Sequence, residues 1–244
     1  MNDRYTPTFN IHEAVRKTLP YMMEMREYFH AHPELSEKEF DTCKTIFQEL
    51  SLMGIEDVKI IAGTGVTGLI HGALPGPVIL LRADIDALPL TEKFDCPYSS
   101  LVDGVMHACG HDGHAANLLG VAKILNKHKD CLRGTIRLAF QPAEEGNGGA
   151  ARMIDAGILN NPRVDYALGL HRRSGCPLQL AAAFEDPVLP DGGFTVPSRE
   201  RLRSFFRNMQ HTWNLQADIT AELPDMRADD FTEKLTAPLP LSNA

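Results

Sequence analysis

Strand-like and helix-like hydrophobic patterns alternate along the first 170 residues of this 244-residue chain, and no other feature limits its fold so strongly. Helical spacing of apolar residues predicts helices over 20–32, 36–54, 115–127 and 149–159. Short apolar runs predict strands over 58–61, 67–70, 78–82, 135–140 and 164–170. The run at 78–82 is continuous, as in strands buried on both faces. We therefore predict an α/β fold, with a mostly parallel sheet sandwiched by helices.

Local signals predict where several of these elements begin and end. Pro20 is expected near the start of the first helix, because proline is tolerated in the first turn. Ser36 followed by Glu39 forms a capping-box pattern, which predicts the start of the second helix, and Gly54 is expected to end it. The stretch 75–77, Pro-Gly-Pro, predicts a turn before the buried strand.

Composition narrows the class of protein. A formal net charge of -8, without a Lys/Arg-rich run, argues against a nucleic-acid partner. The polar start does not resemble a signal peptide, and no apolar stretch is long enough to span a bilayer, so we expect no membrane partner. Five scattered cysteines, without a CxxC pair, suit a reducing compartment better than a disulfide framework. We expect a cytoplasmic protein.

Three histidines, a cysteine and an aspartate fall within residues 104–114. Imidazole, thiolate and carboxylate are the side chains that bind borderline transition metals. Cys109 and His111 are two residues apart, so in extended backbone both side chains point to the same side and can face one metal or a close pair. Taken alone, the pattern also fits a structural zinc patch or a fortuitous polar loop.

Acidic residues and a further histidine directly follow three of the predicted strands. Ligands collect outside the carboxyl ends of the strands in such sheets. A metal hydrolase needs one carboxylate as ligand and another that takes a proton from water. Each feature also has a plainer interpretation: an acidic turn, turn chemistry, or an ordinary surface histidine. The residues concerned are Asp84 and Asp86, Glu144 and Glu145, and His171.

Five strings, at 26–36, 81–90, 106–114, 140–146 and 168–171, closely resemble the amidohydrolase branch of the aminoacylase/carboxypeptidase metallopeptidases. They occur in the family's order and cover roughly residues 10–175. The resemblance implies a zinc-peptidase-like catalytic domain, and we assign its N-terminal part to residues 1–175. It also implies hydrolysis of the amide bond of N-acyl amino acids, small-molecule substrates, at a binuclear manganese or zinc site. Homodimers, formed through a lid domain, are typical of the family.

The resemblance also implies a role for individual residues. Glu144 is the expected general base that activates water. Asp86 is expected to orient a ligand, and Asp112 and His114 to lie around the ligands rather than on the metal. The metal ligands implied by the family pattern are Cys109, His111, Glu145 and His171.

The resemblance weakens after residue 175. Residues 176–244 show neither the lid's Gly-Gly-His-type motif nor the last histidine ligand, and we expect an atypical tail in place of the lid domain and the rest of the catalytic domain. An incomplete ligand set is expected to weaken the second metal position. The alternative interpretation is a truncated or frameshifted family member that folds poorly or binds metal without catalysis.

Overall fold

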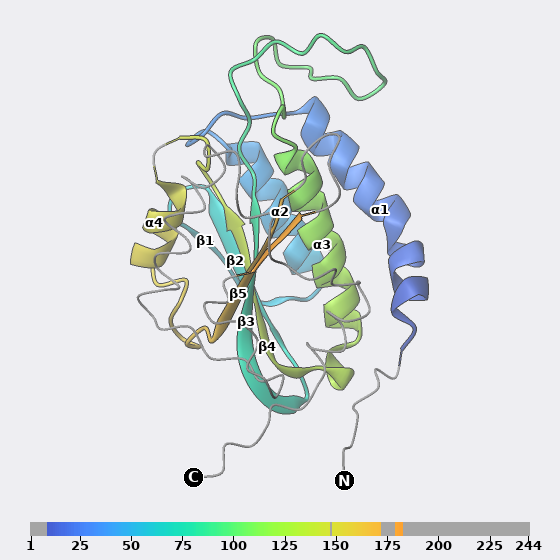
Figure 1. Ribbon diagram of the computed structural model, residues 1–244, viewed down its shortest axis with the longest axis vertical. Coiled ribbons are helices and arrows are strands. Elements are labelled where there is room, and N and C mark those ends of the chain that lie inside the picture. The colour runs from blue at the N-terminus through green and yellow to red at the C-terminus, as the bar shows by residue number, and fades with distance from the viewer. Residues whose placement is uncertain (1–8, 147, 172–178, 183–244) are drawn as a thin grey trace.

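The computed structural model describes residues 9–146, 148–171 and 179–182 (Figure 1). Within them the chain forms one six-stranded sheet, four α-helices and one short 3-10 helix, Lys129–Cys131. The helices are α1 (Ile11–Ala31), α2 (Phe40–Leu52), α3 (His111–Lys127) and α4 (Gly149–Asp155). The strands are β1 (Glu56–Ile61), β2 (Gly65–His71), β3 (Leu74–Asp84), β4 (Arg133–Gln141), β5 (Tyr166–His171) and β6 (Gln179–Ala182).

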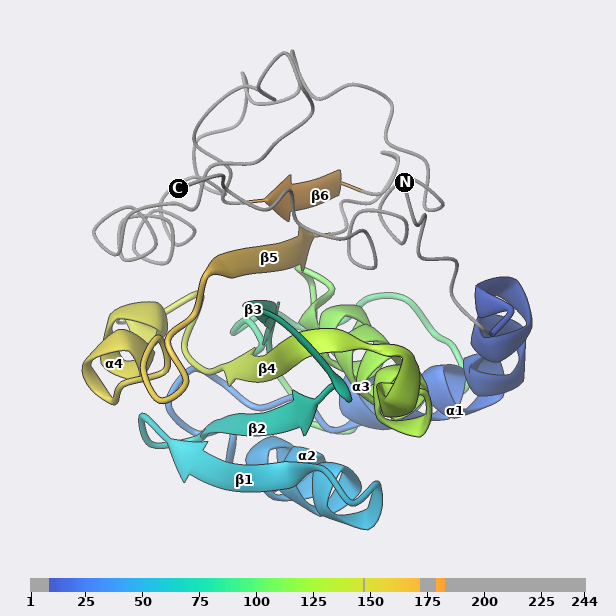
Figure 2. The ribbon, with the colours of Figure 1, turned by 90° about the horizontal axis from the view of Figure 1, so that it is seen from below.

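The sheet is mixed, which corrects the prediction of a mostly parallel one. Its order is β1-β2-β4-β3-β5-β6 (Figure 2). β3 pairs in parallel with β4 and β5, whereas β1–β2, β2–β4 and β5–β6 are antiparallel. A parallel pair needs a crossover of a dozen or more residues. The connection between β1 and β2 is only residues 62–64, so these two strands form a hairpin.

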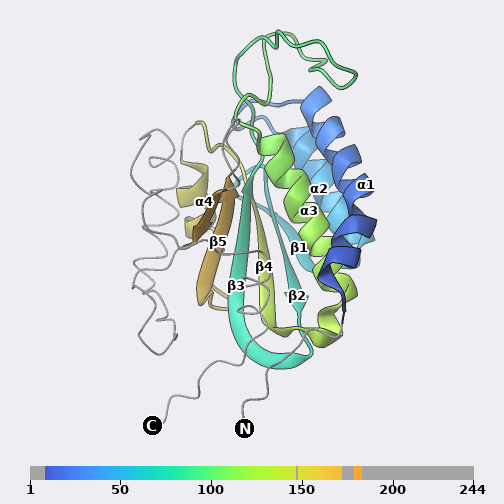
Figure 3. The same cartoon turned by 45° about the vertical axis from the view of Figure 1, so that its right-hand side comes forward.

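Helices cover both faces of the sheet, as the α/β prediction requires. α1, α2 and α3 lie on one face and α4 lies on the other (Figures 1 and 3). Successive side chains of β3 point to opposite faces of the sheet, because side chains alternate along a strand. Ile79 joins the core under α1, α2 and α3, whereas Leu80 joins the core under α4. Burial on both faces explains why residues 78–81 are apolar without interruption.

Two helix starts differ from those predicted. α1 begins at Ile11 rather than near Pro20, because the Asn10 side chain accepts a hydrogen bond from the Glu13 amide at 3.0 Å and caps it. Pro20 lies inside the helix. α3 begins at His111 instead of residue 115. The first histidine of α3 therefore stands on a helical turn rather than on extended backbone.

The capping box predicted for α2 does not form. Ser36 donates its hydroxyl to Asp86 instead, and Glu39 makes no side-chain cap bond to the helix. The carboxylate of Glu34 accepts hydrogen bonds from the amides of residues 41 and 42 at 3.2 and 2.8 Å. The start of α2 is thus capped from farther upstream, which frees Ser36 and Glu39 for other partners.

The predicted turn at 75–77 lies within β3, where the ladder with β4 is interrupted between Leu74 and Val78. The predicted tail, residues 176–244, lies outside the described residues except for β6. In the part of the chain that is described, no helix combines the length and apolarity needed to cross a membrane.

Candidate metal site at the ends of three parallel strands

The three central parallel strands place the predicted site residues at one edge of the sheet. β3 leads into Asp84 and Asp86, the neighbouring β4 leads into Glu144 and Glu145, and β5 ends at His171. The long connection from β3 returns through residues 85–110 to the start of α3 at the same end of the molecule (Figure 1). Four segments distant in sequence therefore meet here, as expected for the carboxyl ends of parallel strands.

Cys109, His111 and Glu145 converge on one point. One potential ligand atom of each lies within 4.8 Å of the other two. Gly110 between the first two has φ of 87° and precedes the first turn of α3, which corrects the expected extended backbone. That left-handed conformation suits glycine. Two ligands of a tetrahedral zinc lie about 3.5 Å apart, so this spacing fits a metal ion.

The orientation of His111 leaves one ring nitrogen aimed at this point. Its Nδ1 lies 2.9 Å from the carbonyl oxygen of Asp86, and because a carbonyl only accepts, Nδ1 carries the proton. Nε2 is buried without a hydrogen-bond partner. It lies 3.6 Å from Asp84 Oδ2, 3.8 Å from Glu144 Oε2 and 3.9 Å from Glu145 Oε1, all beyond hydrogen-bond range. An orphaned imidazole nitrogen facing carboxylates is the arrangement that a cation completes.

Electrostatics of the site also favour a cation. Burial opposes charge on His111, which is 1% exposed, but the Asp84 carboxylate and the Asp86 hydrogen bond raise its pKa well above the ordinary value. Burial raises the pKa of the Cys109 thiol, and the nearby His111 partly offsets this. Burial, with Asp84 nearby, raises the pKa of Glu144 to about 7. Without a metal, protonated His111 balances part of the negative charge of the surrounding carboxylates. A bound divalent ion would neutralise that charge instead.

A second set of potential ligands adjoins the first, but its carboxylate already has a cationic partner, Arg82. Asp84, His111 and His114 also place ligand atoms within 4.8 Å of one another. However, Asp84 is fully buried against the guanidinium of Arg82 and accepts a 2.6 Å hydrogen bond from Nδ1 of His114. An ion-paired carboxylate attracts a further cation less. The group with Cys109 is therefore the better candidate for a metal.

Asp86 and Asp112, two further residues named from the sequence, have hydrogen-bond partners of their own. Asp86 Oδ2 accepts hydrogen bonds from the Ser36 hydroxyl at 2.6 Å and from the Glu145 amide at 2.9 Å. Asp86 thus touches both His111 and the loop of Glu145. Asp112 bonds His30 Nδ1 at 2.7 Å and pairs with Arg26 at 2.9 Å. Its described contacts thus tie α3 to α1.

The side chain of His171 lies outside the described part of the structure, and its role stays a prediction. The backbone of His171 closes β5, and through it the strand pairs with Gln179 of β6.

Several buried polar residues near the site had no functional signal in the sequence. His30 forms hydrogen bonds with Asp112 at 2.7 Å and with Glu92 at 3.0 Å. Arg82 follows the apolar residues of β3, and its side chain is fully buried in an ion pair with Asp84. Glu39 is fully buried under the loop of Glu144. Their partners are remote in sequence.

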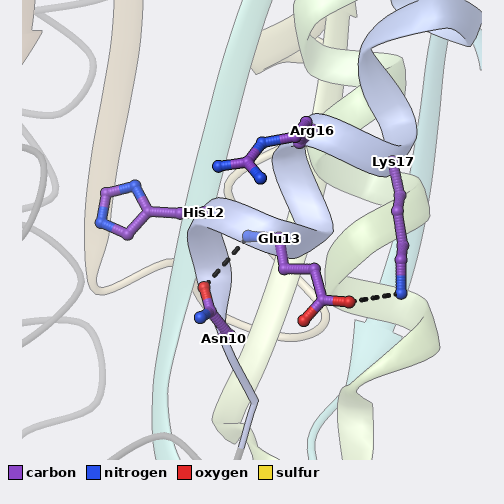
Figure 4. Close-up of a pocket in the computed structure, with 5 residues that line it drawn as sticks. All are labelled: Asn10, His12, Glu13, Arg16 and Lys17. Atoms are coloured by element: carbon purple, nitrogen blue, oxygen red, sulfur yellow. Dashed lines mark hydrogen bonds and ion pairs between the residues drawn. The ribbon is translucent and has the colours of Figure 1, made fainter.

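A surface hollow lies at the start of α1 (Figure 4). Its charged side chains pair locally, since Lys17 Nζ lies 2.6 Å from Glu13. His30, which bonds Asp112, lies near the other end of α1. The hollow is lined by Asn10, His12, Glu13, Arg16 and Lys17.

Comparison with known proteins identifies the class to which this fold and donor set belong. The model of the peptidase family M20/M25/M40 matches residues 80–226, and the chain belongs to this family. The match continues past residue 175 into the stretch that we predict to be a tail.

Individual relatives share the same region. Thermostable carboxypeptidase 1 of Saccharolobus solfataricus is 46% identical over 178 residues, which are 72% of this chain and 45% of that protein. N-acetylcysteine deacetylase of Bacillus subtilis is 44% identical over 170 residues, 69% of this chain and 44% of that protein. The crystal structure of Bacillus subtilis YXEP, a dinuclear metal binding peptidase of the M20 family, has a TM-score of 0.63 at 44% identity. That similarity covers 66% of this chain and 45% of YXEP, so the chain spans less than half of each relative.

Proposed function

We propose that this chain carries the catalytic centre of a metal-dependent amidohydrolase acting on N-acyl amino acids. The observation that carries the proposal is the convergence of Cys109, His111 and Glu145 beside the buried carboxyl group of Glu144. The names of two relatives, a carboxypeptidase and an N-acetylcysteine deacetylase, support an amide substrate with an amino-acid part.

The proposed metal ligands are Cys109, His111 and Glu145, with His171 joining from the end of β5. Thiolate, imidazole and carboxylate together suit zinc, and the carboxylates also suit manganese. When bound, such an ion polarises a carbonyl oxygen and lowers the pKa of water. A thiolate ligand is best preserved in a reducing compartment, which supports our expectation of a cytoplasmic protein. We also propose that the catalytic part of the chain ends near residue 175, and that the protein forms a homodimer.

Glu144 is the proposed proton carrier. Its carboxyl group is 6% exposed, and its pKa of about 7 lies close to neutral pH, where a general base works best. As the water oxygen bonds to the amide carbon, Glu144 takes a proton from that water. When the carbon–nitrogen bond breaks, Glu144 returns the proton to the leaving amine. Water and amide are thereby converted into a carboxylic acid and a free amino acid.

Metal analysis combined with hydrolysis assays tests this proposal. The purified chain is loaded with Mn²⁺ or Zn²⁺ and assayed on N-acetyl and N-benzoyl amino acids. Glu144→Gln should retain the metal content of the wild type but lose about 10²–10⁴-fold in kcat. Cys109→Ala should lose metal. Full metal binding by the wild type without hydrolysis of any of these substrates would contradict the proposed activity, and unchanged metal in Cys109→Ala would contradict the site.

A further inference from the structure

The connection between α1 and α2, residues 32–39, touches both loops that carry the candidate site. The carbonyl oxygen of Glu34 accepts a hydrogen bond from the amide of Ala87 at 2.8 Å. The Ser36 hydroxyl donates to Asp86 at 2.6 Å. This connection therefore supports the loop after β3, and its last residue reaches the loop after β4.

That last residue is Glu39, which is fully buried. Its Oε1 accepts a hydrogen bond from the backbone amide of Ala143 at 2.8 Å. Its Oε2 accepts one from the Thr64 hydroxyl at 2.6 Å. Glu39 thus joins the start of α2, the end of the β1–β2 turn and the loop that follows β4. A buried acidic group with a donor on each oxygen holds those donors in place.

The residue held by Glu39 has an unusual backbone conformation. Ala143 has φ of 47°, in the left-handed region that is unfavourable for a residue with a Cβ. Its carbonyl oxygen accepts a hydrogen bond from Gly149 at 3.3 Å. Glu144 and Glu145 follow directly, so the direction of this peptide decides where both side chains lie. Contacts from outside the loop must keep the conformation.

We infer that Glu39 is a positioning residue, which fixes the peptide of Ala143 and thereby aims Glu144 and Glu145 at the metal centre. This inference rests on the proposed function. Without the carboxyl group, the buried amide of Ala143 loses its acceptor, and the loop relaxes toward ordinary negative φ. The ligand Glu145 and the base Glu144 then leave their positions around His111.

Three variants of the full chain test this role. Glu39→Ala removes the acceptor. Glu39→Gln keeps both contacts, because its amide oxygen accepts from Ala143 while its amide nitrogen donates to Thr64. Glu34→Ala is the matched control, because it deletes a carboxylate from the same connection. The carboxylate of Glu34 caps α2, and its hydrogen bonds are to that helix rather than to the loop after β4.

The readouts are amide hydrogen exchange of residues 143–145, Mn²⁺ affinity measured against a chelating dye, and kcat. In Glu39→Ala, exchange should rise, and both Mn²⁺ affinity and kcat should fall about tenfold, as expected for an orphaned buried donor. Glu39→Gln should stay within about threefold of the wild type for the same reason. Glu34→Ala should lower stability without changing exchange at 143–145 or Mn²⁺ affinity.

The outcomes separate this inference from the proposed function. Equal behaviour of Glu39→Ala and Glu34→Ala in exchange and Mn²⁺ affinity overturns the positioning role. A wild type that neither binds Mn²⁺ nor hydrolyses substrate refutes the proposed function, and exchange at residues 143–145 then decides whether Glu39 holds the loop. If Glu39→Ala does not fold, Thr64→Val, which loosens the other side of the carboxyl group, should raise exchange at 143–145 to a lesser extent. No rise there also overturns the role.

Discussion

Replacing Arg82 by methionine should destabilise the chain by about 3 kcal/mol, the lower end of the range for breaking a buried ion pair. The side chains of Arg82 and Asp84 are both 0% exposed and paired with each other. Methionine keeps the apolar volume but leaves the Asp84 carboxylate buried without its guanidinium. The lower end of the range applies because His114 still donates to Asp84 at 2.6 Å.

Urea unfolding followed by circular dichroism at pH 7 measures this loss. Arg152→Met is the control, because its pair with Glu37 is 38% and 47% exposed and should contribute less than about 1 kcal/mol. Adding Asp84→Asn to Arg82→Met removes the stranded charge and should restore at least about 1 kcal/mol. Equal losses for Arg82→Met and Arg152→Met would refute the idea that a buried charge depends on Arg82.

The same pair has a predictable pH dependence. Burial raises the pKa of Asp84, but Arg82 and the two histidines outweigh it and hold the pKa well below the ordinary value of 3.8. A depressed folded-state pKa stabilises the fold above the unfolded value, and this contribution disappears as pH falls through the folded value. The cost of Arg82→Met should therefore be largest where Asp84 is ionised in both proteins, and should shrink as falling pH protonates Asp84 in the variant, whose pKa is no longer lowered by the guanidinium.

Three further predictions use other buried groups. Burial raises the pKa of the Cys43 thiol to about 11. Iodoacetamide at pH 8 should therefore label Cys43 only after unfolding, which mass spectrometry can measure. Rapid labelling of the native chain would contradict the burial of Cys43. Gly149→Ala should strongly destabilise the fold, because a Cβ at residue 149 would clash with the carbonyl oxygen of Pro142. Gly113→Ala has open space for its Cβ and should stabilise α3 by up to about 1 kcal/mol. Urea unfolding compares the two variants, and similar effects would count against the packing described. Hydrogen bonds to Asp112 and Glu92 raise the pKa of His30 above 6.5. Protonated His30 therefore stabilises the fold fully below pH 6.5, and this stabilisation declines as pH rises through the folded-state pKa. His30→Gln should lower the free energy of unfolding more at pH 6 than at pH 9, and an equal loss at both would disprove the charge on His30.

Sequence patterns predicted the elements of this fold better than their pairing. The buried run at 78–82 indicates a strand covered on both faces, and β3 is such a strand. Pairing direction depends on connection length, and the three residues between β1 and β2 already required an antiparallel hairpin. A periodicity argument that disregards connection length assigns too many parallel pairs.

The site could be predicted to the extent that its residues follow strands or share one short motif. Glu144 and Glu145 follow β4, and Cys109 and His111 are two residues apart, so the sequence indicates each pair, whereas only the folded chain places the two pairs near one another. Ser36 was assigned to a local capping box, whereas its partner Asp86 lies 50 positions away. A local pattern cannot anticipate such a partner, because only the folded sheet brings the two segments together.

Cobalt substitution tests most directly whether Cys109 belongs to a metal centre. The chain loaded with Co²⁺ should show a thiolate-to-cobalt charge-transfer band in the near ultraviolet, since the thiolate is the form of cysteine that binds metals. The band should be absent in Cys109→Ala and intact in Cys96→Ala, a control cysteine from the loop 85–110. A wild type without the band, or a band that survives Cys109→Ala, would contradict the metal centre described above.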